Sequence, residues 1–418
     1  MIAFSVRPFL LAGLVGMALA GCLRINVQGT PDSRVLERLP EEMARRVRAA
    51  MPPVRFATYN VSLYSDAAGG LVKRLQGDDA GARKIAAVLQ RVRADVVLLN
   101  EFDHDAEGRA ADLFQRDYLE VGQHGGAPIV YPFRYFAEVN TGVASGLDLD
   151  RDGQVGRSGR AYGNDAWGYG QHPGQYGMLV LSRYPLDIAR VRSFRLLKWA
   201  ALPSARRPLD AQTGRPFHAD AVWKQLRLSS KSHWDVPVLT PQGIIHFLVA
   251  HPTPPTFDGP DDRNGARNAD EIRLWAEYVS GRPRPWLCDD DGRCGGLAAD
   301  ARFVIAGDMN ADPRDGEARP GAIDQLLESP RVLDYAAPRS AGAAERARIY
   351  GLPRKGDTAT HTGDFGPKVG TLRIDYVLPS RGLRVRDAGV AWPMQAAPDA
   401  RFADGSDHHA VWVDLVRE

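Results

Sequence analysis

The stretch FVIAGDMNADP, residues 303–313, shows a pattern that other parts of the chain repeat. Its first four residues are apolar and predict a short buried strand. Asp308 and Asn310 stand two residues apart, so in an extended chain their side chains project to the same side. A carboxylate and an amide oxygen placed together suit a hard cation, although a strand followed by an Asx-rich turn explains them equally well. The choice depends on how the other predicted strands end.

The composition is that of an ordinary folded protein. The chain has 418 residues, of which 44% are hydrophobic and 25% are charged. This length gives room for one large domain or two average ones. The formal net charge of +2 is too balanced to indicate a nucleic-acid partner, which usually requires a strong basic excess, but it does not exclude a local basic groove.

The N-terminus resembles a targeting signal. Arg7 precedes the apolar run FLLAGLVGMALAGC, which is too short for a comfortable membrane span. The run ends in Leu19-Ala20-Gly21-Cys22, which resembles the signal of bacterial lipoproteins, with Cys22 as the lipidated new N-terminus. A plain secretory signal and a simple apolar N-terminal helix are the alternatives. Leu23 follows the cysteine, and in a two-membrane bacterium this residue favours sorting to the outer membrane.

This signal divides the chain into three parts. We expect residues 1–21 to be a signal peptide, residues 22–53 to be a spacer next to the anchor, and residues 54–418 to form the folded domain. The spacer contains a charged, helical-looking piece at 37–50.

Cys288 and Cys294 enclose the short loop CDDDGRC. An exported chain meets an oxidising compartment, so we predict a disulfide between them, which would stabilise the fold by ~2 kcal/mol. Two thiols are too few for a structural zinc site.

Apolar runs within the domain predict many strands and a few helices. This alternation indicates an α/β or α+β sandwich in a single domain. Residues 141–175 and 198–222 predict long surface loops. The predicted strands are 54–64, 94–102, 131–139, 177–194, 226–239, 243–255, 303–310, 371–380 and 406–416, and the predicted helices are 80–93, 110–118, 268–280 and 322–327.

Several of these strands end or begin with a polar residue of a similar kind. Turn formation, a solvated strand end or a satisfied histidine explains each one singly, but it does not explain the whole set. Carboxylate and amide oxygens suit Mg²⁺, and imidazoles suit proton transfer and phosphate contact. The residues are Asn60, Glu101, His251, Asp308, Asn310, Asp375, Asp407 and His408.

The motifs TYN, LLNE, GDMN, RIDYVL and SDHHAV, in this order, resemble those of the endonuclease/exonuclease/phosphatase superfamily. The resemblance extends from about Val54 to Val416. It implies an α/β fold of the DNase-like type, a four-layered α/β/β/α sandwich of two mainly antiparallel sheets. It places the active site at the mouth between the two sheets.

The resemblance also implies roles for the strand-end residues. Asn60 and Glu101 match the metal-site pair, with Glu101 as the direct Mg²⁺ (or Mn²⁺) ligand, and Asp407 matches a metal-side carboxylate. These three residues form the implied metal site.

The remaining matches face the substrate. Asp308 matches the carboxylate that orients or deprotonates the attacking water, and Asn310 the amide that holds a phosphate oxygen. His408 matches the histidine at the scissile phosphate, and Asp375 the acid that orients it. His251 matches a leaving-group position that is histidine in deoxyribonuclease-like members and tyrosine in apurinic ones.

The segment GLDLDRDGQVG resembles the first half of an EF-hand Ca²⁺ loop, with Asp148, Asp150 and Asp152. Its twelfth position, Gly159, lacks the expected carboxylate, which Asn164 or Asp165 could replace. A solvated acidic turn is the alternative.

Two further groups of residues could lie beside the cleft. Lys231, His233 and Trp234 could grip a phosphate or stack on a substrate, although Trp234 suits the core equally well. Arg263 and Arg267 could contact phosphate or simply begin a solvated helix.

The sequence therefore predicts an exported, lipid-anchored, Mg²⁺-dependent phosphoesterase, with a nuclease-type phosphodiesterase as the leading form. Nucleic acid, phospholipid and organic phosphate are the candidate substrates. Sphingomyelinase-like or phosphomonoesterase activity is the alternative within the superfamily. A non-catalytic, Ca²⁺-stabilised surface binding protein is the alternative of another class.

Overall fold

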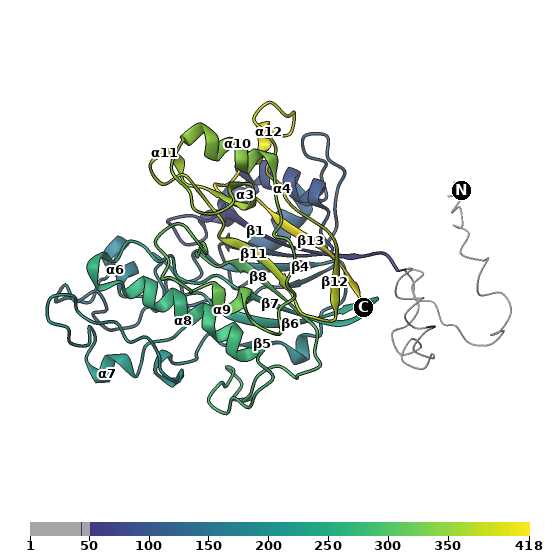
Figure 1. Ribbon diagram of the computed structural model, residues 1–418. Helices are drawn as coiled ribbons and strands as arrows, with labels where there is room; N and C mark the ends of the chain where they lie inside the picture. The colour runs from purple at the N-terminus through teal and green to yellow at the C-terminus, as the bar shows by residue number, and fades with distance from the viewer. Residues whose placement is uncertain (1–42, 44–50) are drawn as a thin grey trace, which may run out of the picture.

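The computed structural model describes residue 43 and residues 51–418 (Figure 1). The predicted signal peptide 1–21, the lipidation site Cys22 and most of the spacer 22–53 lie outside the described residues. Within the described part of the chain, no helix is both long enough and apolar enough to span a membrane.

The larger sheet has six strands in the order β12-β13-β1-β2-β4-β3. Strand β1 pairs in parallel with β2, and the other neighbours pair antiparallel. The strands are β1 (Val54–Leu63), β2 (Val96–Phe102), β3 (Phe133–Tyr135), β4 (Met178–Ser182), β12 (Leu383–Val390) and β13 (Val411–Arg417).

The second sheet has five strands in the order β11-β8-β7-β6-β5, of which only β7 and β8 pair in parallel. A separate two-stranded ribbon joins β9 (Gly363–Asp364) to β10 (Thr371–Leu372). The five strands are β5 (Arg192–Ser193), β6 (His233–Thr240), β7 (Gly243–Ala250), β8 (Phe303–Asp308) and β11 (Asp375–Pro379).

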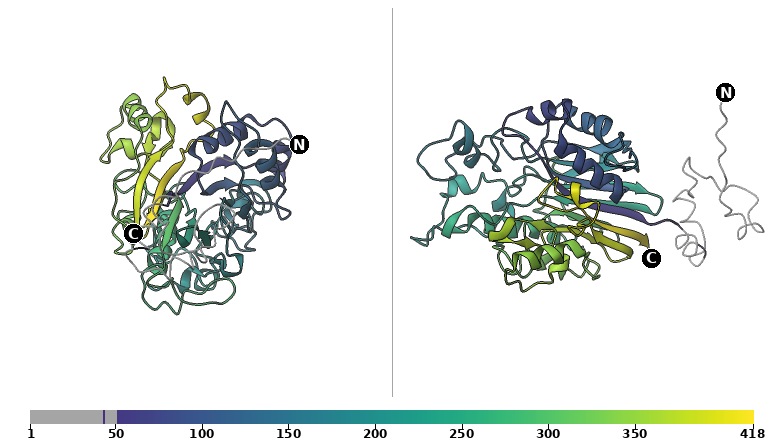
Figure 2. Two further views of the ribbon diagram at one scale, coloured as in Figure 1. Left: turned by 90° about the vertical axis from the view of Figure 1, so that its right-hand side faces the viewer. Right: turned by 90° about the horizontal axis from the view of Figure 1, so that it is seen from above.

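Helices cover the outer faces of the two sheets. One side carries α3 (Gly70–Gln76), α4 (Ala80–Val92) and α5 (Arg109–Leu113), the dark-blue helices of Figure 2. The other side carries α8 (Arg263–Tyr278) and α9 (Asp324–Leu327). Over residues 51–418 the remaining helices are η1 (Phe114–Leu119), α6 (Gly159–Asn164), η2 (Ile188–Arg190), η3 (Trp199–Ala201), α7 (Asp220–Trp223), η4 (Gly259–Asp261), α10 (Ala341–Tyr350), η5 (Thr358–Thr360), α11 (Gly366–Val369) and α12 (Ala400–Ala403).

Three apolar layers follow from the alternation of side chains along the strands. In β1, Phe56 packs between the sheets, whereas Ala57 and Tyr59 belong to the layer under the helices. In β8, Val304 lies between the sheets and Ile305 lies under α8. Strands buried on both faces have continuous apolar sequences, so their sequence patterns are distinctive. The predicted four-layered α/β/β/α sandwich of mainly antiparallel sheets is confirmed.

The boundaries of some elements differ from the predictions. Strand β13 begins at Val411 and not at Ser406, and residues 226–232 precede β6 as a loop. Helix α8 begins at Arg263, five residues before its predicted start. The predicted helix 110–118 divides into α5 and the π-helix η1, and the strand at 383–390 and the helix α10 were not predicted.

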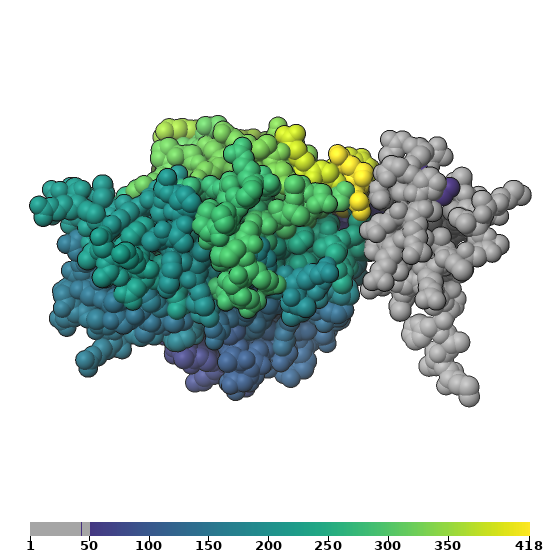
Figure 3. All heavy atoms as spheres, turned by 90° about the horizontal axis from the view of Figure 1, so that it is seen from below, coloured from purple at the N-terminus to yellow at the C-terminus, as the bar shows by residue number. Residues whose placement is uncertain are grey.

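The long connections in the middle of the chain form a large part of the surface at one end of the molecule, where the teal segments of Figures 1 and 3 lie. The predicted loop 141–175 is mostly irregular, with α6 as its only helix among the described residues. Cys288 and Cys294 are joined in a disulfide, which closes the loop that the sequence suggested.

Candidate active site

The sheet registers bring the polar strand ends together. Asn60 of β1 lies opposite Asn100 of β2, and the pairing of these strands shifts just beyond this point. Asp375 of β11 lies directly opposite Asp308 of β8. Residues directly opposite in an antiparallel pair place their side chains on the same face, so the two carboxylates are neighbours.

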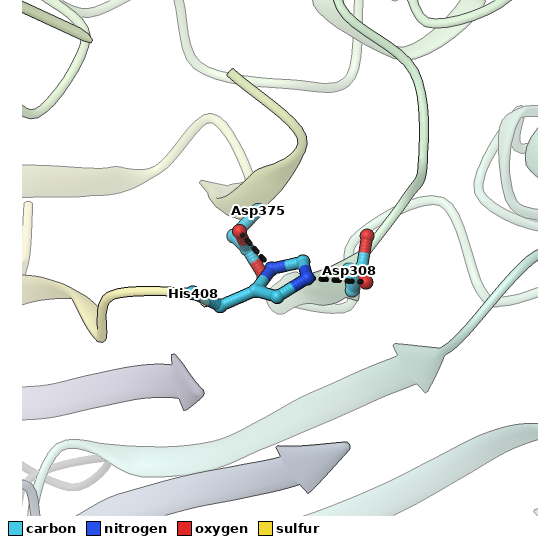
Figure 4. Close-up of side chains that lie close together, drawn as sticks. All are labelled: Asp308, Asp375 and His408. Atoms are coloured by element: carbon cyan, nitrogen blue, oxygen red, sulfur yellow. Dashed lines mark hydrogen bonds and ion pairs between the residues drawn. The ribbon is translucent and has the colours of Figure 1, made fainter. Parts of the chain in front are cut away.

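His408 lies between these two carboxylates, as Figure 4 shows. Its Nδ1 is 2.9 Å from Asp375 Oδ2, and its Nε2 is 3.6 Å from Asp308 Oδ2. All three side chains are buried. An imidazole held by one carboxylate at Nδ1 presents its Nε2 in a fixed direction, which is the arrangement needed to transfer or donate a proton.

Asp308 is the centre of this site. Its Oδ2 accepts a hydrogen bond from Asn60 Nδ2 at 3.1 Å and lies 3.5 Å from His251 Nε2. Nδ1 of His251 is buried without a hydrogen-bond partner in the described structure. The carboxylate is therefore flanked by one amide and two imidazoles.

Gly307 allows β7 to approach closely enough for this contact. A Cβ at Gly307 would lie 2.0 Å from the carbonyl oxygen of Ala250, and its φ of +152° is rare for other residues. His251 immediately follows Ala250, so the close approach brings its ring to Asp308. Any side chain at this glycine would separate the two strands.

The expected geometry of Asn310 is wrong. The strand ends at Asp308, and Asn310 has a left-handed backbone with φ of 51°. Its N–H donates to Asp308 Oδ1 at 2.9 Å, and its Nδ2 donates to the carbonyl of Pro252 at 3.2 Å. The stretch is therefore an Asx turn as well as part of the polar cluster, because an Asp carboxylate readily caps the backbone two residues on.

A loop, and not the last strand, carries His408. The N–H of His409 donates to the carbonyl of Thr362 at 2.8 Å, and the N–H of Asp364 donates to that of Asp407 at 2.7 Å. Oγ1 of Thr362 in turn accepts from the N–H of Asp375 at 3.0 Å. One short segment therefore fixes both partners of the His408–Asp375 pair.

Burial and charge shift the protonation equilibria of this cluster. Burial raises the pKa of Asp308 to about 7, although the neighbouring charge of His408 opposes the shift. Burial would lower the pKa of His408, but the charges of Asp375 and Asp308 raise it well above its usual range. Burial lowers the pKa of His251 well below its usual range, with a further effect from the charge of Lys231. The site thus combines a proton acceptor that titrates near neutrality, a cationic imidazole and a neutral one.

Glu101 also interacts with the side chain of Asn60. It is partly buried near the end of β2 and has a left-handed backbone with φ of 56°. Burial raises the pKa of Glu101, the Asn60 side chain opposes this shift, and the charge of Asp407 adds to it. Asp407 is exposed and accepts a hydrogen bond from Ser62 Oγ at 3.2 Å. The predicted metal-side residues are therefore neighbours.

The residues present fit a hard divalent cation. The donor set of Glu101, Asn60 and Asp407 consists of carboxylate and amide oxygens, which Mg²⁺ and Mn²⁺ prefer. His408 and Lys231 are nearby cations that lower the pKa of Glu101, and Asp375 Oδ1 is buried without a hydrogen-bond partner in the described structure. The ligand atoms of Asp308, Asp375 and His408 also lie within 4.8 Å of one another. In this second set, Nδ1 of His408 is already 2.9 Å from Asp375 Oδ2.

Three supporting residues were missed or underrated from the sequence. Oδ1 of Asn100 accepts from the N–H of Asp308 at 3.3 Å, and its Nδ2 donates to the carbonyl of Ala250 at 3.4 Å. Glu271 accepts from the N–H groups of Ser230 and Thr253, both at 2.6 Å, and so holds the loops on either side of His251. Lys231 is buried, and the charges of Glu271, Glu101 and Asp308 act on it. LLNE contains Asn100, but no motif marked Glu271.

The other suggested contacts lie in structural positions. His233 bonds to Ser229 Oγ and to the carbonyl of Glu271, and Trp234 is buried between the sheets. Arg267 donates to backbone carbonyls of Leu228, Trp167 and Arg227. Arg263 donates to the carbonyl of Leu149.

The Asp148, Asp150 and Asp152 carboxylates lie within 4.8 Å of one another. Each also accepts a backbone N–H within the loop, from Gly153, Asp152 and Gln154 respectively. The carboxylate of Asp165 accepts backbone N–H groups from Leu149 and Gly156. Nδ2 of Asn164 donates to Asp150. This arrangement suits both an ion loop and a self-bonded acidic turn.

A comparison with protein-family models agrees with this arrangement of residues. Residues 57–408 match the model of the Endonuclease/Exonuclease/phosphatase family. The chain belongs to this family. It is a metal-dependent phosphoester hydrolase, and the residue set at the sheet edge is its candidate active site.

Solved structures with similar folds are distant. An endonuclease/exonuclease/phosphatase from Beutenbergia cavernae is 19% identical with a TM-score of 0.47, and the match covers 88% of this chain and 72% of that one. Sphingomyelinase C from Streptomyces griseocarneus is 16% identical (TM-score 0.41; 87% and 99% covered). A mannosyl-6-phosphatase from Bacteroides thetaiotaomicron is 13% identical (TM-score 0.44; 87% and 99% covered). None of the curated proteins matches the chain.

The raised pKa of Asp308 predicts a pH-dependent cost to stability. The pKa is about 7 in the folded protein against an ordinary 3.8, so the unfolding free energy falls as pH rises between these values. Asn does not titrate, so in EDTA we expect the stability of Asp308→Asn relative to the wild type to rise by on the order of 2 kcal/mol between pH 5 and pH 8. Denaturant unfolding from pH 5 to 8 measures this difference, which should shrink toward pH 5.

The control is Asp300→Asn, because Asp300 is exposed. A stability difference for Asp308→Asn that is constant across the pH range would contradict the assigned titration.

Proposed function

We propose that the protein hydrolyses a phosphodiester with Mg²⁺ (or Mn²⁺) bound at Glu101, Asn60 and Asp407. The observation that carries this proposal is the position of His408, which is held by Asp375 and faces Asp308 across a buried site. When bound, the cation neutralises the anionic phosphate oxygens and stabilises the charge that develops on them.

The side chains divide the remaining work. Asp308, whose pKa is about 7, accepts a proton from the attacking water near neutral pH. Asn60 holds the carboxylate of Asp308 in place. His408 donates a hydrogen bond from Nε2 to the scissile phosphate, and Asp375 keeps it charged and oriented. Asn310 contacts a phosphate oxygen, and His251 stands on the leaving-group side.

The charge of the site favours a diester over a monoester. Lys231 and His408 are the cations that act on Glu101, whereas Asp308, Asp375 and Asp407 add negative charge around them. A phosphomonoester carries up to two negative charges near pH 7, and a diester carries one. One divalent ion with few cationic side chains matches the smaller charge better.

The His408→Ala variant tests the proposal. It is expected to lose about 10²- to 10⁴-fold in turnover, because it removes a positioned proton donor. The assay compares bis-p-nitrophenyl phosphate with p-nitrophenyl phosphate, each with Mg²⁺ and with EDTA. His124→Ala is the matched control, because His124 is exposed. A His408→Ala variant with near-wild-type turnover would refute the role of His408.

The same assay separates the alternatives. Faster cleavage of the monoester would indicate a phosphomonoesterase, and no Mg²⁺-dependent cleavage of either compound would favour a binding protein. Plasmid DNA and sphingomyelin added as further substrates distinguish a nuclease-type enzyme from a sphingomyelinase-like one. We place nucleic acid first among the substrates.

We also propose that the protein is an exported cell-envelope lipoprotein anchored through Cys22, in the outer membrane if the cell has two. The signal-like sequence that ends in Leu19-Ala20-Gly21-Cys22 supports this, and so does a disulfide at Cys288–Cys294. Mass spectrometry of the membrane fraction should find a lipid on the wild-type N-terminus and none on a Cys22→Ser variant. An unmodified wild-type chain would rule the anchor out.

We further propose that Asp148, Asp150 and Asp152 hold Ca²⁺. Three carboxylates within 4.8 Å form an all-oxygen site that suits this ion. Calorimetry of the EDTA-treated protein should give a Ca²⁺ binding heat that Asp150→Ala abolishes, together with a rise in Tm. A wild-type protein with neither response has no site there.

A further inference from the structure

A second group of potential ligands lies outside the active site. Asp312 and Asp315 follow β8, and His361 follows the short helix η5. One ligand atom from each of these residues lies within 4.8 Å of the others. The sequence motifs of the active site do not include any of the three.

His361 is the unusual member of this group. Its side chain is 1% exposed, and its Nδ1 lies 2.7 Å from Thr371 Oγ1. Its Nε2 is buried and has no hydrogen-bond partner in the described structure. A buried polar atom without a partner is costly, so it indicates a missing ligand. The Thr371 hydroxyl can accept from Nδ1–H, which leaves the Nε2 lone pair free for a metal, as the outer partners of metal-bound histidines commonly do.

The two carboxylates retain free acceptor positions. Asp312 Oδ1 accepts from the N–H groups of Arg314 and Asp315, both at 2.8 Å, and its Oδ2 accepts from that of Arg373 at 2.7 Å. Asp315 accepts from the N–H groups of Lys355 and Gly356 at 3.0 and 2.9 Å. A carboxylate has about four acceptor sites, so both can bind an ion without losing these contacts.

Loop capping alone explains only part of this arrangement. It accounts for the carboxylates, since each fixes backbone N–H groups. The charge of Arg354 acts on Asp315 and His361, but its guanidinium donates to the carbonyl of Val369. Neither loop capping by the carboxylates nor the charge of Arg354 gives a hydrogen-bond partner to the buried Nε2 of His361.

We propose that Asp312, Asp315 and His361 bind a divalent transition-metal ion. Two carboxylate oxygens and one imidazole nitrogen form a donor set that Zn²⁺ and Mn²⁺ accept, with water completing the coordination. The imidazole distinguishes this site from the all-oxygen sets at Glu101 and at Asp148, which suit Mg²⁺ and Ca²⁺.

An ion at this site would stabilise the segment that carries Asp375. Asp312 already holds the N–H of Arg373, and Thr362, next to His361, holds the N–H groups of Ile374 and Asp375. An ion bound by both Asp312 and His361 would therefore link the two segments that hold the backbone N–H groups of residues 373–375. Its role is structural, because none of the three ligands reaches Asp308 or His408 in the described contacts.

Calorimetry on the full chain tests the proposal. The EDTA-treated, dialysed protein is titrated with ZnCl₂ and, separately, with MnCl₂. A background of Glu101→Gln and Asp150→Ala weakens binding at the active site and at the acidic loop 148–152, so one remaining equivalent is expected. Adding His361→Gln should abolish that equivalent and the rise in Tm that accompanies it, whereas adding His124→Gln, at an exposed histidine, should change neither.

Asp315→Asn in the same background provides a second variant if His361→Gln fails to fold, as judged by circular dichroism. Its amide oxygen keeps an acceptor for one of the two backbone N–H groups, which donate to Oδ1 and Oδ2 of Asp315 separately, and the variant is expected to weaken binding about tenfold or more. Zn²⁺ or Mn²⁺ binding that neither variant changes would overturn the proposal. Binding of Mg²⁺ and Ca²⁺ to the site of Asp312, Asp315 and His361 as tightly as Zn²⁺ or Mn²⁺ would also overturn it.

Discussion

Two buried carboxylates lie opposite each other in neighbouring strands of one sheet. The electrostatic repulsion between them must be offset by the groups around them. Asp308 and Asp375 are directly opposite in the β8–β11 pair, where like charges destabilise a sheet. His408 contacts both and supplies the positive charge that lowers the cost. Asn60 contributes a further donor to Asp308. The surrounding fold holds both carboxylates in place, because burying a carboxylate next to another one is unfavourable in itself.

The same cost gives the site its chemistry. A carboxylate in water is protonated only in acid, and burial moves the pKa of Asp308 to where it can exchange a proton near neutrality. The opposite shift at His408 keeps a proton on the imidazole beside it. Burying these charged residues lowers the free energy of unfolding, and the three apolar layers offset this cost. Residues such as Phe56 and Val304 are fully buried in them. A strained, charged edge on a well-packed sandwich is therefore consistent with an enzyme of the endonuclease/exonuclease/phosphatase family.

Sequence patterns predicted the strands well because both faces of each sheet are covered, which makes runs such as Phe303–Ala306 continuously apolar. They also identified the polar strand ends, because each motif is contiguous. They failed where long-range contacts decide the conformation. The left-handed backbone of Asn310 depends on Asp308 and Pro252, and the loop position of His408 depends on pairing with residues 362–364. Supporting residues such as Glu271 carry no local pattern, since their role is to join loops distant in sequence.

The loop after β8 contacts both the candidate active site and the group formed by Asp312, Asp315 and His361. Asp308 belongs to the candidate active site and accepts from the N–H of Asn310, whereas Asp312 lies near His361 and accepts from the N–H of Arg373. Because Arg373 lies two residues before Asp375, the contact of Asp312 with Arg373 helps to fix the segment that carries Asp375. The buried, unpartnered Nε2 of His361 is then best understood as part of that support. The contacts of Asp312 hold the end of this loop that lies away from Asp308. A loop held at that end can keep Asp308 next to His408 although the environment of the carboxylate is unfavourable.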